Sequence, residues 1–327
     1  MDGRARVTLS QLRTFLAVAR LGSVKAAAAS LGVSEPAVSG AVASLRRELG
    51  DPLFQRGGHG VRLTAGGHRL AASAAEIVGL AEDARRGIRE LGERRAQLRV
   101  AATPAAAEYV VPFLLDAFAR RQPDLDTSIL AAPGAALPGL LRDRRADVAV
   151  GPRPPADAGA ALVSVPFLRF QLAVVTGRRH PLAAQAPVRL DQLAHQHWAL
   201  GPGGLDRGTL AGALLARLGV RPEDVSAYPS TAGALHAAAE GRGVSLAYRH
   251  VVTGELAAGD LVDLAPQGCD LSGLLYASQL AADRSSPTAA ALVRFLGTPA
   301  ATQAALHLSG GVPMASFRPA VFVTIWS

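Results

Sequence analysis

An apolar stripe between residues 64 and 94 constrains this chain more than any other feature of its sequence. Apolar side chains recur there at alternating steps of four and three, which is a heptad pattern and predicts one long helix. At 1.5 Å per residue, about 30 residues span roughly 45 Å, more than one small module can cover. The helix therefore needs a partner. The stripe consists of Leu70, Ala74, Ile77, Ala81, Ala84, Ile88 and Leu91.

A second copy of the same helix is the simplest partner, because two identical stripes can pack against each other. We expect the larger residues of the stripe to make this dimer contact, namely Leu70, Ile77, Ile88 and Leu91. The alternative is that the helix packs lengthwise on its own domain, in which case the stripe belongs to an ordinary core.

Three short helices are predicted before the long one. Thr8 and Gln11 fit a capping box that opens the first helix, and Gly22 ends it. Ser23 caps the second helix and Ser34 caps the third. Steps of four, three and four mark the buried face of the third helix, which we expect at Val38, Val42, Leu45 and Leu49.

The second and third helices, joined by a tight turn, are typical of a helix-turn-helix, whose second helix enters the major groove of DNA. That helix needs small or polar residues at its leading end, and Ser34, Glu35 and Ser39 meet this requirement. The alternative is any three-helix bundle with short loops.

A hairpin is predicted next, from strands at 53–56 and 61–63 with a glycine-rich tip. Beside a helix-turn-helix such a hairpin is a wing, and Arg56 and Arg62 could reach phosphates or the minor groove from it. Residues 1–97 carry 15 Lys and Arg against 9 Asp and Glu, while the remainder is nearly neutral. This asymmetry favours a module that binds a polyanion, although a solvated basic surface would have the same composition.

From residue 98 onward, short apolar segments alternate with amphipathic ones, which predicts a parallel sheet with helices on its faces. A first α/β unit has strands at 98–102, 128–130 and 147–150 and helices at 109–121 and 137–145. A second has strands at 172–175 and 244–247 and helices at 207–218 and 232–240. We expect the chain to cross back at 266–269 and to complete the first unit with residues 273–278 and a helix at 287–296.

Residues 9–64 resemble the DNA-binding domain of the LysR-type transcriptional regulators. The matching segments are Phe15-Leu16-Ala17-Val18-Ala19, Gly22-Ser23, Ala26-Ala27, Leu31, Val33-Ser34-Glu35-Pro36-Ala37-Val38-Ser39, Leu45, Leu49-Gly50, Leu53-Phe54 with Arg56, and Leu63-Thr64 with Gly67. Residues 98–306 resemble the effector-binding region of the same family, which has a periplasmic-binding-protein-like fold.

The resemblance implies a multidomain chain: an all-α winged helix-turn-helix domain with a long linker helix, then an α/β effector domain of two subdomains. We expect the DNA-binding domain at 1–64, with its helix-turn-helix at about 24–43, and the linker and dimerisation helix at 65–95. The effector domain is expected at 96–306, with subdomain I at about 96–163 and 267–306 and subdomain II at about 164–266. A C-terminal tail follows at 307–327.

Carried onto this sequence, the family's DNA-binding surface implies contacts from the first three helices and the wing. The candidates are Gln11, Ser23, Lys25, Ser34, Glu35, Pro36, Ser39, Arg46, Arg56 and Arg62. The chain departs from the family pattern at Glu35, where glutamine is usual. A carboxylate only accepts hydrogen bonds, so Glu35 suits the amino group of cytosine or adenine. Alternatively, Glu35 only complements the helix dipole.

The effector is expected in the cleft between the subdomains, beyond the carboxyl ends of the strands. The positions carried over are Thr103, Pro133, Gly134, Gly204, Arg207, Ser230 and Thr231. Hydroxyls and helix N-termini favour anions, and Arg207 would suit a carboxylate. Each of these residues also has a local alternative, as a helix cap or a surface cation.

The leading hypothesis is a ligand-responsive, sequence-specific DNA-binding transcription regulator that is not an enzyme. Its expected partners are operator DNA, a small effector, further copies of itself and RNA polymerase, with no membrane and no cofactor. The alternatives are a solute-binding protein or an enzyme on the same α/β fold, and an architectural DNA-binding oligomer without an effector.

Other features of the sequence agree with the leading hypothesis. Neither a secretory signal nor an apolar membrane span is evident, so we expect a cytoplasmic protein. His195 and His197 have no further ligand at a metal-binding spacing, so we expect a surface pair and no metal. Cys269, the single cysteine, is expected in the core.

Overall fold

The computed structural model describes residues 7–57, 60–93, 95–156 and 162–306. The chain divides into two compact units, one made of residues up to 94 together with 142–145, and the other of the remaining residues. The predicted C-terminal tail at 307–327 lies outside the described residues. Among the described residues no helix is both long and apolar enough to cross a membrane.

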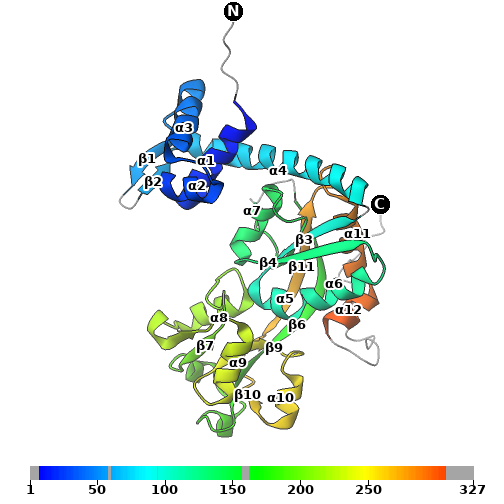
Figure 1. Cartoon of the computed structure of the whole chain (residues 1–327). Helices are drawn as coiled ribbons and strands as arrows, with labels where there is room; N and C mark the ends of the chain where they lie inside the picture. The colour runs from blue at the N-terminus through cyan, green and yellow to red at the C-terminus, as the bar shows by residue number, and fades with distance from the viewer. Residues whose placement is uncertain (1–6, 58–59, 94, 157–161, 307–327) are drawn as a thin grey trace, which may run out of the picture. The chain divides into compact units, whose positions relative to one another are not determined.

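The first unit consists of four helices and a hairpin (Figure 1). Its elements are α1 (Leu9–Leu21), α2 (Val24–Leu31), α3 (Glu35–Leu49), β1 (Phe54–Gly57), β2 (Gly60–Leu63) and α4 (Ala65–Glu93). The predicted helix boundaries are confirmed. Thr8 and Gln11 form the capping box of α1, Gly22 ends that helix, and the Ser23 and Ser34 side chains cap α2 and α3.

The core of this unit gathers the apolar faces of α1, α2 and α3 around the hairpin. The rings of Phe15 and Phe54 lie 5.1 Å apart at its centre. The prediction of a buried face on α3 is confirmed for Val38, Val42 and Leu45 but is wrong for Leu49. That residue is exposed because it is the last of its helix, where the chain turns away at Gly50.

The long helix α4 exists as predicted, but its stripe does not remain on one free face. Ala74, Ala75 and Val78 are buried against the core of the first unit, and Leu70 packs partly against it. On another face of the same helix, Ile77 and Ile88 are exposed. One face of α4 therefore follows the alternative in which the helix packs on its own domain, and a second face keeps uncovered apolar side chains.

The second unit contains a seven-stranded sheet. Its order is β10-β6-β11-β5-β3-β4, with β9 also paired to β6. The strands are β3 (Ala96–Ala102), β4 (Leu125–Ala131), β5 (Val148–Gly151), β6 (Leu162–Gly177), β9 (Ser245–Tyr248), β10 (Leu261–Asp263) and β11 (Ser272–Leu280). A separate parallel pair is formed by β7 (Trp198–Leu200) and β8 (Val225–Ala227).

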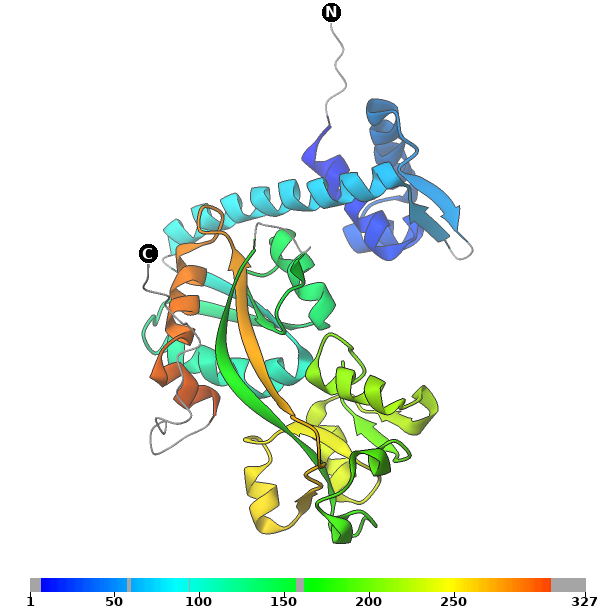
Figure 2. The same cartoon turned by 180° about the vertical axis from the view of Figure 1, so that it is seen from behind.

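The main sheet is mixed, whereas the sequence pattern predicted a parallel one. Only β3, β4 and β5 pair in parallel. The predicted strand at 172–175 is the last part of β6, which has 16 residues and pairs antiparallel with β11, β9 and β10. Figure 2 shows β6 and β11 running side by side through the unit. The strand β6 continues from one predicted subdomain into the other, and Pro166 lies within it, where the pairing with β11 shifts its register.

Eight helices are described in the second unit: α5 (Pro104–Tyr109), α6 (Val111–Ala119), α7 (Leu137–Arg142), α8 (Leu210–Leu218), α9 (Thr231–Ala239), α10 (Thr253–Ala258), α11 (Pro287–Leu296) and α12 (Pro299–Ala305). The helix expected at 109–121 is α6, and α5 precedes it, starting at Pro104 directly after β3. An additional helix therefore lies at the end of that strand, where the effector was expected.

The two neighbouring histidines and the single cysteine lie near the surface. His195 and His197 are exposed, and the described residues contain no cluster of His, Cys, Asp and Glu suited to a metal ion. His197 Nε2 is 2.8 Å from Ser226 Oγ. Cys269 is only half-buried at the edge of the core, and Arg217 Nη2 donates to its Sγ.

One ion pair links β3 to the start of β5. The Arg99 guanidinium contacts both carboxylate oxygens of Asp147, at 2.8 and 3.1 Å, and the Arg99 backbone N–H donates to Oδ2 at 2.8 Å. The Asp147 side chain is buried. A buried carboxylate that accepts three hydrogen bonds holds the start of β5 against β3.

We therefore expect Asp147→Ala to destabilise the second unit by about 3 kcal/mol, because it leaves a partly buried guanidinium without this partner. Asp191→Ala is the matched control, since Asp191 makes a similar two-oxygen contact with Arg189 on the open surface, where such pairs contribute little. Urea unfolding followed by the fluorescence of buried Trp198, in a chain carrying Trp326→Phe, measures both. Equal unfolding midpoints for the two variants would contradict the stabilising role of the Arg99–Asp147 ion pair.

Candidate functional sites

The exposed side of α3 is the first candidate site. Ser34, Glu35, Pro36, Ser39 and Arg46 are all exposed on it. Because Val38, Val42 and Leu45 hold the opposite side in the core, the polar leading end of α3 faces away from the rest of its unit. The helix is thus free to enter a groove.

The other residues predicted to bind DNA divide into two groups. Lys25, Arg56 and Arg62 are exposed, and none of them makes an ion pair with another described residue. In contrast, Gln11 and Ser23 are half-buried and already bonded. Gln11 belongs to the capping box and donates to Ser44 Oγ at 3.0 Å, and Ser23 Oγ accepts from the Ala26 N–H.

The hairpin that carries the two arginines is fixed at the end of α1. Arg56 pairs with Val61 across the two strands, and Arg62 pairs with Gln55. The Val61 N–H donates to the Gly22 carbonyl oxygen at 3.0 Å. Gly60 has φ 138°, and a Cβ atom there would lie 2.4 Å from the same oxygen. Only glycine therefore allows the hairpin to sit this close to α1.

A second surface feature lies on the later turns of α4. We call Ile77, Leu80, Ala84 and Ile88 the exposed stripe, because all four are exposed and follow each other at steps of three, four and four. Ile88 is 72% exposed. Leu80 was missed in the sequence because it falls beside the heptad positions. The side chain of Leu91, which the prediction included, lies outside the described residues.

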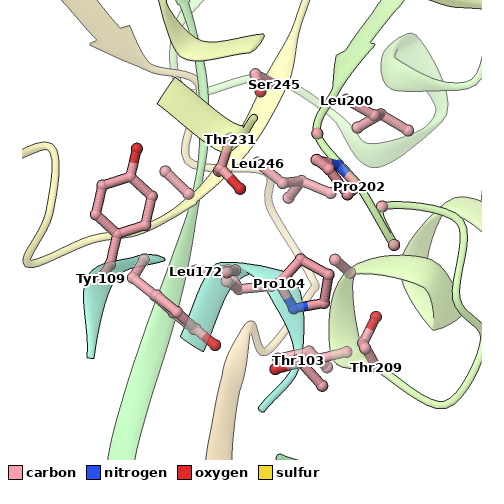
Figure 3. A pocket seen from close by; sticks show the side chains of 18 of the residues that line it. Thr103, Pro104, Tyr109, Leu172, Leu200, Pro202, Thr209, Thr231, Ser245 and Leu246 are labelled. Atoms are coloured by element: carbon pink, nitrogen blue, oxygen red, sulfur yellow. The ribbon is translucent and has the colours of Figure 1, made fainter. Parts of the chain in front are cut away.

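A cavity of about 100 Å³ in the second unit is the third candidate site (Figure 3). It is lined by α5, the loop after β7, the start of α8, the start of α9, β9 and the middle of β6. Most of its wall is apolar, including Tyr109, Phe170, Leu172, Leu200, Leu246 and Tyr248. The polar side chains in the wall are Thr103, Thr209, Thr231 and Ser245.

Three of these polar side chains, those of Ser245, Thr209 and Thr103, are bonded within the chain. Ser245 Oγ donates to the Ala199 carbonyl at 2.8 Å, and Thr209 Oγ1 donates to the Asp206 carbonyl at 2.7 Å. Burial raises the pKa of the Tyr248 phenol, which is hydrogen-bonded to Thr103. Burial and the negative charge of Glu108 raise the pKa of Tyr109. Both phenols therefore remain neutral, and the wall presents hydroxyls rather than charges.

Three of the seven residues predicted to bind the effector meet in this cavity: Thr103, Gly204 and Thr231. The structure does not place the other four in its wall. Ser230 caps α9, Arg207 is exposed, Pro133 is exposed, and the Gly134 N–H donates to Asp206 Oδ2 at 2.8 Å beside a different hollow. The aromatic wall residues were missed because Phe170 and Tyr248 become neighbours only when β6 pairs with β9.

Two family models together match most of the chain. Residues 9–68 match the family model described as the bacterial regulatory helix-turn-helix protein, lysR family, and residues 91–300 match the one described as the LysR substrate binding domain. An uncharacterized HTH-type transcriptional regulator of Mycobacterium tuberculosis is 39% identical, over 98% of this chain and 100% of that relative.

Two further proteins are similar over most of their length. The HTH-type transcriptional regulator CfxR of Cupriavidus necator is 30% identical, over 86% of this chain and 88% of its own. The crystal structure of full-length CbnR complexed with the target DNA matches 88% of this chain and 98% of its own, with a TM-score of 0.57. At 22% identity, this last likeness concerns the fold.

Because the hairpin lies so close to α1, we expect the stability of the first unit to depend on the glycine at position 60. Gly60→Ala should destabilise the first unit by at least about 1 kcal/mol, because its φ is unfavourable for alanine and its Cβ meets a backbone oxygen. Gly40→Ala is the matched control. It lies within α3 with no atom near its added Cβ, so it should stabilise the helix by about 0.5–1 kcal/mol. Hydrogen exchange of peptides around residues 22 and 61 measures both effects, and unchanged protection in Gly60→Ala would contradict the prediction.

Proposed function

This chain belongs to the LysR family of bacterial transcriptional regulators, and on that premise we propose which of its surfaces bind DNA, effector and a second copy. The protein is a ligand-responsive DNA-binding regulator. In the proposal α3 enters the major groove, the hairpin binds the backbone beside it, and the cavity of the second unit holds the effector. The chain catalyses no reaction in this scheme, and since its target is chromosomal DNA, the scheme places it in the cytoplasm.

The observation that carries the DNA-binding assignment is the polar leading end of α3. Ser34, Glu35 and Ser39 are exposed on one helix, and a helix fits the major groove with such side chains at the base edges. Arg46, Arg56 and Arg62 add exposed positive charge on the same unit, which suits the phosphates. Gln11 and Ser23 then act by holding α1 and α2 in place.

The effector assignment is supported by the cavity itself. A concave, mostly apolar space with a few convergent hydroxyls is typical of small-molecule sites. Thr103, Gly204 and Thr231 are the residues of this chain that both the family resemblance and the geometry bring there. Its volume of about 100 Å³ suits a small molecule.

Footprinting of the purified full-length chain on fragments of its own genome tests the proposal. We expect protection of a few discrete sites, with spacing that reflects two copies of the winged unit. Uniform coating of all fragments at the same protein concentration would instead indicate an architectural protein, and no binding at all would remove the DNA-binding assignment.

Replacing Arg56 or Arg62 with alanine should weaken binding to specific and random DNA alike. Because each arginine is assigned to one phosphate, the slope of log K against log salt should become shallower by about one in either variant. Arg120→Ala is the control, since Arg120 is exposed on the second unit. A changed base preference with an unchanged salt slope would contradict the role of these arginines.

The exposed stripe on α4 is assigned to dimerisation. Ile77→Asp with Ile88→Asp should give monomers in sedimentation, because the change puts two charges into each copy of an apolar contact. Ala72→Asp with Arg89→Asp is the control, since both side chains are exposed on α4 but lie away from the stripe. A dimeric Ile77/Ile88 variant at micromolar concentration would show that another surface makes the dimer.

A further inference from the structure

The carboxylate of Glu108 connects two walls of the cavity. Glu108 belongs to α5, and its oxygens reach the start of α9. The Thr231 N–H donates to Oε2 at 3.0 Å, and the Ala232 N–H donates to Oε1 at 3.1 Å. Tyr109 on α5 and Thr231 on α9 both line the cavity. The Glu108 side chain therefore joins α5 to α9, and residues of both helices line the cavity.

These two hydrogen bonds occupy the N-terminus of α9, which is the part of the helix to which an anionic effector would bind. The first N–H groups of a helix are unpaired within it and carry partial positive charge, so they attract anions. In α9 the first two are taken by Glu108, and the third, from Gly233, donates to Ser230 Oγ at 3.0 Å. None of these three leading N–H groups of α9 is left for a ligand.

A second carboxylate, that of Asp206, belongs to the segment between Gly204 and Thr209, two residues that line the cavity. Asp206 precedes α8, whose first residues Leu210 and Ala211 line the wall. Its Oδ2 accepts from the Gly134 N–H at 2.8 Å and its Oδ1 from the Gly208 N–H at 2.9 Å. Like Glu108, Asp206 thus accepts hydrogen bonds from two backbone N–H groups, those of Gly134 and Gly208.

The charges around the cavity therefore disfavour an anion. All side chains that line it in the described part of the chain are apolar or neutral, and the carboxylates of Glu108 and Asp206 belong to residues close in the chain to the lining residues Tyr109 and Thr209. Arg207, on which the expectation of a carboxylate effector depended, is exposed and outside the wall. A ligand carboxylate would meet like charges without a cation to offset them, which costs binding free energy.

We infer that the cavity takes a small, uncharged and mostly apolar effector, and that Glu108 occupies the place of an effector's anion at α9. This inference rests on the proposed function, in which the cavity is the effector site. The ligand's apolar body packs against the aromatic wall around Phe170 and Tyr248. A single hydroxyl or carbonyl group on it meets Thr103 or Thr231.

Two probes of similar shape and different charge test the inference on the full chain. Cyclohexanol should raise the melting temperature of the wild-type protein and bind in calorimetry. Cyclohexanecarboxylate should bind at least about tenfold more weakly, because its charge meets Glu108 and Asp206. Ala211→Leu, which narrows the cavity, should abolish the cyclohexanol response, and its own melting transition reports whether it folds.

Substitution of Glu108 gives the sharper result. Glu108→Ala frees two N–H groups of α9 and removes one charge, so the variant should gain binding of cyclohexanecarboxylate by about tenfold or more. Glu108→Gln keeps the shape, removes the charge, and should show a smaller gain. Glu223→Gln is the control, because Glu223 is an exposed carboxylate of the same unit that pairs with Arg221 away from the cavity.

The outcomes separate this inference from the proposed function. If cyclohexanecarboxylate binds the wild type as well as cyclohexanol does, and Ala211→Leu binds neither, the cavity is the effector site but the inferred ligand class is wrong. If the Glu108 variants gain no anion binding, the role of Glu108 is wrong. If neither probe binds the wild type, the cavity assignment falls together with the inference, while footprinting still decides the DNA-binding function.

Discussion

The second unit depends on the continuous pairing of β6. This strand pairs with β11 over its first part and with β9 and β10 over its last part. Its middle residues, Phe170 and Leu172, lie in the cavity wall, so the strand that joins the two halves is also part of the site. A change in the angle between the two halves would therefore alter the contacts of a ligand that lies against β6.

In the first unit, one helix performs two tasks. One face of α4 completes the core around Phe15, and another face leaves Ile77 and Ile88 uncovered. Exposed large apolar side chains at helical spacing are uncommon on a free surface, and they indicate a surface that another chain covers. In the proposed function, a single helix thus joins the winged module to the surface that is assigned to the dimer contact.

The two carboxylates beside the cavity illustrate how a general anion-binding feature can be satisfied within a chain. A helix N-terminus attracts negative charge whatever its source. Here Glu108 supplies that charge to α9, and the bond joins α5 to α9 at the edge of the site. In the inference drawn above, the same contact disfavours an anionic ligand at α9.

Elements with local signals could be predicted from the amino-acid order. Thr8, Ser23 and Ser34 mark helix starts through bonds to the backbone three residues on, and heptad spacing marks the length of α4. In contrast, only the folded chain reveals which part of that helix is covered, that β6 continues through both halves, and that Phe170 meets Tyr248. Of the predicted effector residues, Thr103, Gly204 and Thr231 came together while Arg207 did not. Caps and periodicity act over a few residues, whereas burial and cavity walls depend on strands and loops that are far apart in the chain.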